Sequence, residues 1–99
     1  MQFRHTDKTL QKIDDDLEFN GRLGLNIANA FRTLMLHVRA ADNESDLCRM
    51  KSLHFEKLKG KRKGEYSMRL NKQFRLIFEI EKTGEHNQLV ITGIEDYHS

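Results

Sequence analysis

Hydrophobic residues recur with a helical period over the first part of the chain. A helix is predicted from Thr6, which can cap it, to about Asn20-Gly21, and Asp7 favours its positive end. A second helix is predicted from about Asn26 to Ala40. The apolar face of the first helix consists of Leu10, Ile13 and Leu17, and that of the second of Ile27, Ala30, Phe31, Leu34 and Val38, widened by Ala28, Met35 and Leu36.

A polar cluster, Asp42 to Asp46, comes directly after the second predicted helix. Such a run of Asp, Asn and Ser predicts a turn and a new helix start, with Asn43 as the cap. Leu47 and Met50 then lie at the spacing of a short third helix.

The second half of the chain alternates between apolar and polar residues, which predicts an antiparallel sheet. The predicted core-facing residues are Tyr66, Met68 and Leu70 on one strand and Phe74, Leu76, Phe78 and Ile80 on the next. Asn71-Lys72 supplies a tight turn between them. Arg69, Arg75 and Ile77 alternate to the other side, so that the two arginines share one open face of the sheet. A last strand is predicted from Gln88 to about Glu95.

Helices followed by strands predict an α+β fold, in which N-terminal helices pack on a small twisted antiparallel sheet. The 99 residues suffice for one domain with one core, so residues 1–99 are taken as a single domain. The sequence contains no apolar run of about 20 residues and begins without the apolar core of a signal peptide. With its single cysteine, the chain is therefore expected to be cytoplasmic and to have no membrane partner.

Charge is distributed unevenly along the chain. From Lys57 to Arg75 there are eight basic residues and one acid, Glu65, which gives this segment a net charge of +7. Such density suits the neutralisation of a phosphate backbone. The predicted RNA contacts are Lys57, Lys61, Arg62, Lys63 and Lys72. A basic run that merely forms a solvated loop is the alternative, and the charge pattern leaves both open.

Two sequence segments resemble a known family. The first runs from Leu58 to Phe78 and reads LKGKRKGEYSMRLNKQFRLIF, and the second is Glu95-Asp96-Tyr97-His98. Together they resemble the HigB toxins of the RelE/ParE superfamily, through an LKG-basic-Gly-Y-S-hydrophobic-R pattern, a Q-aromatic-R-hydrophobic segment and a terminal D-Y-H. The resemblance covers roughly the last 45 residues.

The resemblance implies a RelE/ParE-like toxin, one half of a toxin-antitoxin pair. Its expected activity is ribosome-dependent cleavage of mRNA, and its expected partners are mRNA on the ribosome and a HigA-like helix-turn-helix antitoxin. Cleavage in this way needs no cofactor, because the RNA 2′-hydroxyl attacks the adjacent phosphate. The site must then supply a proton acceptor, a proton donor and cations.

Arginine residues are the first candidates for binding the phosphate. A guanidinium can contact two phosphoryl oxygens in a fixed fork, and Arg75 is the preferred residue for this role. Arg69 or Lys59 is expected to share the charge.

Proton transfer is assigned to ionisable residues at the C-terminus and upstream of the basic segment. Tyr97 and His98 are the main candidates, and His54 is a further acid or base. Asp96 can orient either partner. Tyr97, whose ordinary pKa is about 10, would need neighbouring cations such as Lys59 and Arg75 to lower its pKa.

No metal site is predicted. Asp14, Asp15 and Asp16 are acidic neighbours, but successive helical residues diverge by about 100° and do not converge on one ion. Two other functional classes remain open. One is a ParE-like poison that binds gyrase and cleaves nothing, and the other is an RNA-binding module without chemistry. The second would be expected to carry base-stacking aromatics on the outward face of the sheet.

Overall fold

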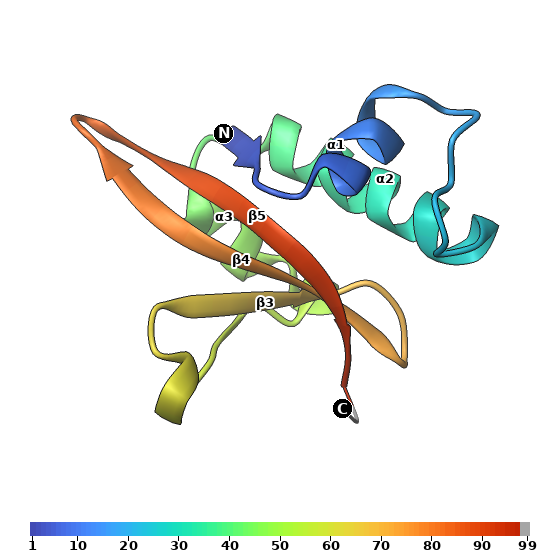
Figure 1. Ribbon diagram of the computed structural model, residues 1–99. Coiled ribbons are helices and arrows are strands. Elements are labelled where there is room, and N and C mark those ends of the chain that lie inside the picture. Colours follow the sequence, from blue (N-terminus) through green and yellow to red (C-terminus); the bar gives the residue numbers. More distant parts are fainter. Residues whose placement is uncertain (98–99) are drawn as a thin grey trace.

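A computed structural model describes residues 1–97, in which α1 and α2 cover one face of a five-stranded sheet (Figure 1). The strand order is β1-β5-β4-β3-β2, with β1 parallel to β5 and the other neighbouring pairs antiparallel. The elements are β1 (Gln2–His5), α1 (Lys8–Asp15), α2 (Leu25–Ala40), α3 (Glu44–Arg49), the 3-10 turn η1 (Lys51–Leu53), β2 (Glu56–Lys57), the 3-10 turn η2 (Gly60–Arg62), β3 (Glu65–Arg69), β4 (Phe74–Thr83) and β5 (His86–Asp96).

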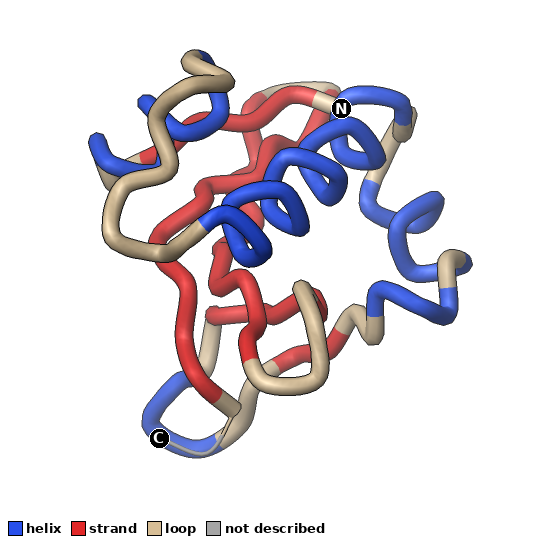
Figure 2. The backbone as a smooth tube through the Cα atoms, turned by 90° about the vertical axis from the view of Figure 1, so that its right-hand side faces the viewer, coloured by secondary structure: helices blue, strands red, loops and turns tan. Residues whose placement is uncertain are grey.

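The longest helix, α2, lies across the strands, as Figure 2 shows from the side. The α+β fold predicted from the sequence is thereby confirmed. No helix among the described residues is long and apolar enough to cross a membrane.

The chain begins with a strand that its sequence pattern did not predict. In β1, Phe3 is opposite Leu89 and His5 is opposite Ile91. Leu89 and Ile91 belong to the core, so this register turns Phe3 and His5 toward the helices. A strand of four residues is too short for a clear alternation, and its partner lies at the other end of the chain. No local sequence pattern therefore predicts β1.

Helix α1 is capped by a different residue from the one predicted. The Asp7 carboxylate accepts hydrogen bonds from the backbone N–H groups of Thr9 and Leu10, at 2.8 and 3.1 Å. Thr6, the expected cap, instead donates its hydroxyl to the carbonyl of Ile91 at 3.3 Å. Pairing with β5 keeps Thr6 in the extended segment, and the helix starts after the next residue able to cap it.

Two leucines that were assigned to the apolar helix faces are exposed instead, Leu17 and Leu36. Helix α1 ends at Asp15, so Leu17 lies beyond it. The buried side chains of α2 are Ala28, Phe31, Leu34, Met35 and Val38. This stripe is narrower than the predicted one, because a helix packed on one sheet buries one side only. The prediction is wrong for both leucines.

In the β3–β4 hairpin the side chains alternate between the two faces of the sheet as predicted, but the connecting turn is longer than predicted. Arg69 is opposite Arg75, so that the two arginines share a face as expected. The connecting loop comprises residues 70–73 rather than two residues. The side chain of Asn71 closes it by accepting the N–H of Phe74 at 2.7 Å.

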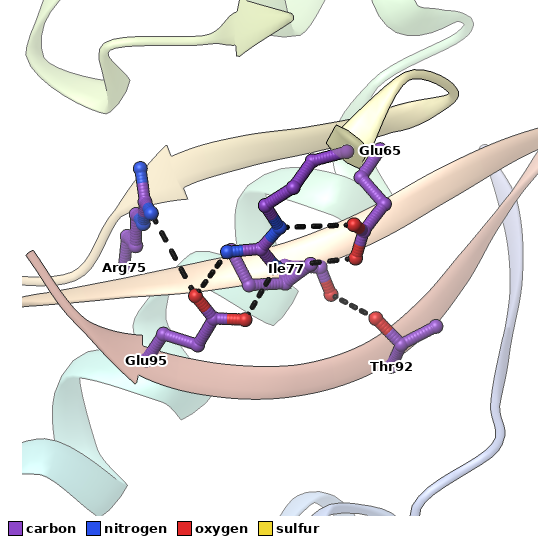
Figure 3. Close-up of polar contacts among 6 residues, drawn as sticks. Glu65, Arg75, Ile77, Thr92 and Glu95 are labelled. Carbon is purple, nitrogen blue, oxygen red and sulfur yellow. Dashed lines mark hydrogen bonds and ion pairs between the residues drawn. The ribbon is translucent and has the colours of Figure 1, made fainter. Parts of the chain in front are cut away.

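A β-bulge interrupts the pairing of β4 with β5. The register shifts after Ile77, which leaves Thr92 as an extra residue, and the Thr92 hydroxyl donates to the Ile77 carbonyl at 3.2 Å (Figure 3). An extra residue exchanges the two faces for the remainder of the strand. Ile91 therefore faces the helices, whereas Glu95 faces the opposite side, where it is paired with Arg75.

A buried polar cluster links β1, α1 and α2. The Asp14 side chain is 3% exposed, its Oδ2 lies 3.0 Å from His5 Nε2, and it accepts two hydrogen bonds from Arg39 at 2.9 and 2.7 Å. Burial raises the pKa of Asp14, but the hydrogen bonds from Arg39 and His5 together outweigh burial and lower this pKa below its ordinary value. The Asp14 carboxylate is therefore charged, and three elements depend on it.

Replacing Asp14 should destabilise the fold. Asp14→Asn removes the charge that pairs with Arg39, and we expect it to lower the free energy of unfolding by about 2 to 4 kcal/mol at neutral pH. Urea denaturation measures this change. Asp15→Asn is the matched control, since Asp15 is exposed on the same helix and should change stability by less than about 0.5 kcal/mol.

The effect of Asp14 should also depend on pH. Its folded-state pKa is lowered, so its contribution is complete above the ordinary value of 3.8 and is lost as pH falls below that value. The difference in stability between the wild type and Asp14→Asn should therefore shrink between about pH 4 and pH 2. An undiminished difference at the acid end would show that the charge of Asp14 is not its source.

Candidate functional site

The sheet face turned away from α1 and α2 is closed at its centre. Ile77 and Ser67 alternate toward this face, yet Ile77 is 2% exposed and Ser67 is fully buried. Arg62 of η2 hydrogen-bonds to both Glu65 on β3 and Glu95 on β5. These two strands flank β4, and the register puts Ile77 midway between the two carboxylates. Arg62 therefore bridges the strands on either side of β4 at the level of Ile77. The expectation of a fully open face is wrong at this point.

A concavity of about 330 Å³ lies beyond the end of this covered region. Its lining residues come from the segment after η1, from β2, from the end of β3, from the hairpin loop and from the segment after β5: His54, Glu56, Arg69, Lys72 and Tyr97. The fold thus brings together four residues that were predicted separately as catalytic or RNA-binding. Glu56 is the addition.

Arg69 is held in place at the edge of the concavity. Its Nε donates to the carbonyl of Asn71 at 3.1 Å, and its Nη1 lies 3.3 Å from Nε2 of His54. A guanidinium has donors only, so in this hydrogen bond Arg69 donates and Nε2 of His54 accepts. The His54 ring therefore faces a fixed cation.

His54 occupies a backbone conformation that side-chain-bearing residues rarely adopt. Its φ and ψ angles are 47° and 53°, in the left-handed region, at the end of η1. This conformation costs about 1 to 2 kcal/mol for a residue with a Cβ. Strain of this kind is often found at functional positions, where the surrounding structure enforces it.

Tyr97 lies against Arg75. Its backbone N–H donates to the carbonyl of Gln73 at 2.8 Å, and the guanidinium carbon of Arg75 is 5.4 Å from the centre of its ring. Burial and the nearby Glu56 raise the pKa of Tyr97, and they outweigh Arg69 and Arg75, which lower it. Arg75 thus lowers this pKa as expected, but the net shift is upward, because burial disfavours the phenolate. The phenol stays protonated at neutral pH.

Arg75 keeps unused hydrogen-bonding capacity. Its side chain is 16% exposed, and its Nη2 lies 3.6 Å from Oε1 of Glu95. Its Nε is buried and has no hydrogen-bond partner among residues 1–97. A guanidinium with donors to spare beside the Tyr97 ring fits the phosphate-binding role predicted for Arg75.

The remaining predicted residues are not brought into the concavity. Lys57, Lys59, Lys61 and Lys63 are exposed outside it. Arg62 is bonded to two carboxylates, and Asp96 accepts a hydrogen bond from the Gln73 side chain at 2.9 Å. His98 lies outside the described residues. The roles of these residues stay predictions.

Glu56 was not among the site residues predicted from the sequence. This residue belongs to a strand of two residues, Glu56–Lys57, paired with β3, and such a short strand gives no alternation to recognise. A weak signal was available, since Glu56 lies two residues from His54, which was already a candidate. In the structure it is the carboxylate lining the concavity, and it influences the pKa of Tyr97.

A larger concavity of about 540 Å³ lies between the α1 N-terminus and the α1–α2 connection, where Phe19, Leu23 and Ile94 give it a mainly apolar lining. It contains none of the predicted site residues. The smaller concavity is the better candidate for chemistry, because it holds the convergent ionisable groups.

Comparisons with known proteins agree with the fold and with the sequence pattern. Residues 2–98 match the family described as the RelE-like toxin of the type II toxin-antitoxin system HigB. Toxin HigB-1 of Vibrio cholerae is 40% identical over 80 residues, which cover 80% of this chain and 83% of that protein. The structure of a YoeB/ParE toxin from Agrobacterium tumefaciens superposes with a TM-score of 0.59 at 19% identity, covering 98% of this chain and 99% of that one, which supports the fold.

The strain at His54 can be measured through substitution. His54→Gly should be more stable than His54→Ala by about 1 kcal/mol, because glycine adopts the left-handed conformation without a steric cost. Urea denaturation of the two variants tests this. The matched pair at the exposed His86, in the extended backbone of β5, should show the opposite order. Equal stability of the two variants at position 54 would contradict the assignment of strain.

Proposed function

The chain belongs to the HigB-like family of RelE-like toxins of type II toxin-antitoxin systems, and on this premise we propose that it cleaves mRNA on the ribosome. The observation that carries the proposal is the concavity in which His54, Glu56, Arg69 and Tyr97 converge, with Arg75 against the Tyr97 ring. These residues offer proton acceptors, a proton donor and two permanent cations within one site. This set is what RNA cleavage by its own 2′-hydroxyl requires.

The proposed reaction is a transesterification within the RNA. A base removes the proton of the 2′-hydroxyl, and the oxygen attacks the adjacent phosphorus. The bond from phosphorus to the 5′ oxygen breaks, and this oxygen takes a proton from an acid. The products are a 2′,3′-cyclic phosphate and a 5′-hydroxyl. Extra negative charge develops on the phosphoryl oxygens, where positioned cations stabilise it.

The geometry suggests how the residues divide these roles. Arg69 and Arg75 are opposite each other on neighbouring strands and would bind the phosphate. Glu56 or His54 would accept the 2′-hydroxyl proton. Tyr97 would donate the proton to the leaving oxygen, which is consistent with a phenol whose pKa is raised. His98 remains a candidate for proton transfer, Asp96 for orienting the acid or base, and Lys59 for sharing the cationic charge.

Binding of the ribosome and of the antitoxin completes the proposal. The exposed Lys57, Lys61 and Lys63, together with Lys72 at the concavity, would contact RNA phosphates. A type II toxin has a cognate antitoxin, which we propose to be a HigA-like helix-turn-helix protein that keeps the toxin from the ribosome. The chain would act in the cytoplasm, where ribosomes translate mRNA.

Removing the phosphate-binding charge should abolish cleavage without unfolding the protein. Arg75→Ala is expected to lower the cleavage rate by about 10² to 10³-fold, and Tyr97→Phe, which removes only a hydroxyl, by about 10²-fold. The measurement is mapping of mRNA ends in a reconstituted translation reaction, with thermal denaturation to verify folding. Arg49→Ala, in an exposed ion pair on α3, is the control.

Each outcome of this assay distinguishes the functional classes. A folded Arg75→Ala variant that cuts at the wild-type rate would remove Arg75 from the site. A wild-type protein that leaves mRNA intact in this assay but arrests growth when it is expressed in cells would favour the ParE-like alternative. Binding of RNA with neither arrest nor cleavage would favour the module without chemistry.

Salt dependence tests the RNA-binding role of the basic segment. Lys61→Ala combined with Lys63→Ala should weaken RNA binding and reduce the slope of log affinity against log salt by about 1.4, the value for two phosphate contacts on a single strand. Lys8→Ala combined with Lys82→Ala removes the same charge from exposed positions elsewhere and should leave the slope unchanged. Equal slopes for the two double variants would show that RNA binding depends on the net charge of the protein and not on Lys61 and Lys63 in particular.

A further inference from the structure

We propose that Arg62 is a positioning residue of this site, which holds the Glu95 carboxylate and so prevents Glu95 from neutralising Arg75. This inference rests on the proposed function, because it concerns the cation expected to bind the scissile phosphate. It assigns Arg62 a role different from the direct RNA contact that its place in the basic segment predicted.

Arg62 contacts Glu95 far more closely than Arg75 does. Two nitrogens of Arg62, Nη1 and Nη2, donate to the two carboxylate oxygens of Glu95 as a bidentate pair. Arg75 reaches one of these oxygens through Nη2 at 3.6 Å, beyond hydrogen-bonding distance (Figure 3). Both oxygens of Glu95 thus accept hydrogen bonds from Arg62, and Arg75 keeps a longer ion pair with the same carboxylate.

A second carboxylate fixes the direction of Arg62. Glu65 accepts hydrogen bonds from Nε at 3.0 Å and from Nη2 at 3.2 Å. All three guanidinium nitrogens of Arg62 therefore donate to the two carboxylates, which lie on the strands that flank β4. A lysine has neither the planar fork nor the number of donors for this arrangement.

Among the described residues, Arg75 is the other cation in contact with Glu95. Arg75 is its direct cross-strand partner, and the two side chains share the outer face. Arg75 has a buried Nε without a hydrogen-bond partner among residues 1–97. Without Arg62, it therefore has N–H groups available to donate to the freed carboxylate in a bidentate pair. In such a pair the charge of Arg75 would be compensated by Glu95, and Arg75 would attract the RNA phosphate less strongly.

The proposal differs from two simpler roles of Arg62. If Arg62 contacts RNA directly, its loss matters whether or not Glu95 is present. If Arg62 merely covers Ile77, its loss changes stability and leaves the Arg75 charge as it was. Only the positioning role makes the effect of Arg62 depend on the carboxylate of Glu95.

A double-mutant cycle in the full chain tests this dependence. The variants are Arg62→Ala, Glu95→Gln and their combination, with Arg49→Ala as a control arginine in an exposed ion pair on α3. Cleavage by Arg62→Ala is expected to fall at least about tenfold in rate at saturating ribosomes, since Arg75 would be compensated. In the Glu95→Gln background, the same change should alter the rate by less than about threefold.

A second measurement does not depend on cleavage. The chain has two tyrosines, so in a Tyr66→Phe background an absorbance titration reports Tyr97 alone. Arg69 and Arg75 lower the pKa of Tyr97, while burial and Glu56 raise it. If Glu95 compensates Arg75 in the Arg62→Ala variant, Tyr97 should titrate at a higher pH than in the wild type. This increase should be largely absent when Glu95 is already glutamine.

The two measurements separate the inference from the proposed function. A cycle that shows coupling in the Tyr97 titration supports the positioning role even if the wild type cuts no RNA, in which case only the proposed function fails. Equal effects of Arg62→Ala on the Tyr97 titration in both backgrounds would overturn the inference, and so would equal effects on cleavage where the wild type cuts RNA. If Arg62→Ala does not fold, Arg62→Lys serves in its place, and unaltered cleavage and titration in that variant would equally overturn it.

Discussion

The pairing of β4 with β5, together with the extra residue at Thr92, is the constraint on which the rest of the structure depends. These are the two longest strands, and they hold the core on one face and the polar network on the other. A strand without the bulge would carry Ile91 and Glu95 on the same face, because they are four residues apart. The bulge allows Ile91 to enter the core while Glu95 joins Arg75 on the outer face.

The outer face combines burial with charge. Ile77 and Ser67 are covered at its centre, and the covering element is a guanidinium between two carboxylates rather than a helix. Hydrogen bonds from Arg62 lower the pKa of Glu95 below its ordinary value. The consequence for function is that some of the positive charge in the basic segment is compensated internally, whereas Arg69 and Arg75 remain near the concavity.

The stabilising ion pairs and the proposed site lie in different parts of the molecule. The His5, Asp14 and Arg39 cluster joins β1 to the helices and contains none of the residues that line the concavity. The concavity instead contains a strained backbone at His54 and a half-buried phenol with a raised pKa at Tyr97. The strain at His54 costs stability locally, and the packed core of α1, α2 and the sheet offsets that cost.

The sequence by itself determined the class of fold, the core of α2 and the shared face of Arg69 and Arg75, since each depends on a short-range period of apolar residues. It also determined the family, because the motifs from Leu58 to Phe78 and at the C-terminus are local strings. The tertiary structure alone decided that β1 pairs with β5, that Glu56 lines the site and that Arg62 is bonded to Glu95. The physical reason is the same in each case: these contacts join residues remote in sequence, and a bulge or a two-residue strand leaves no periodic trace from which they can be inferred.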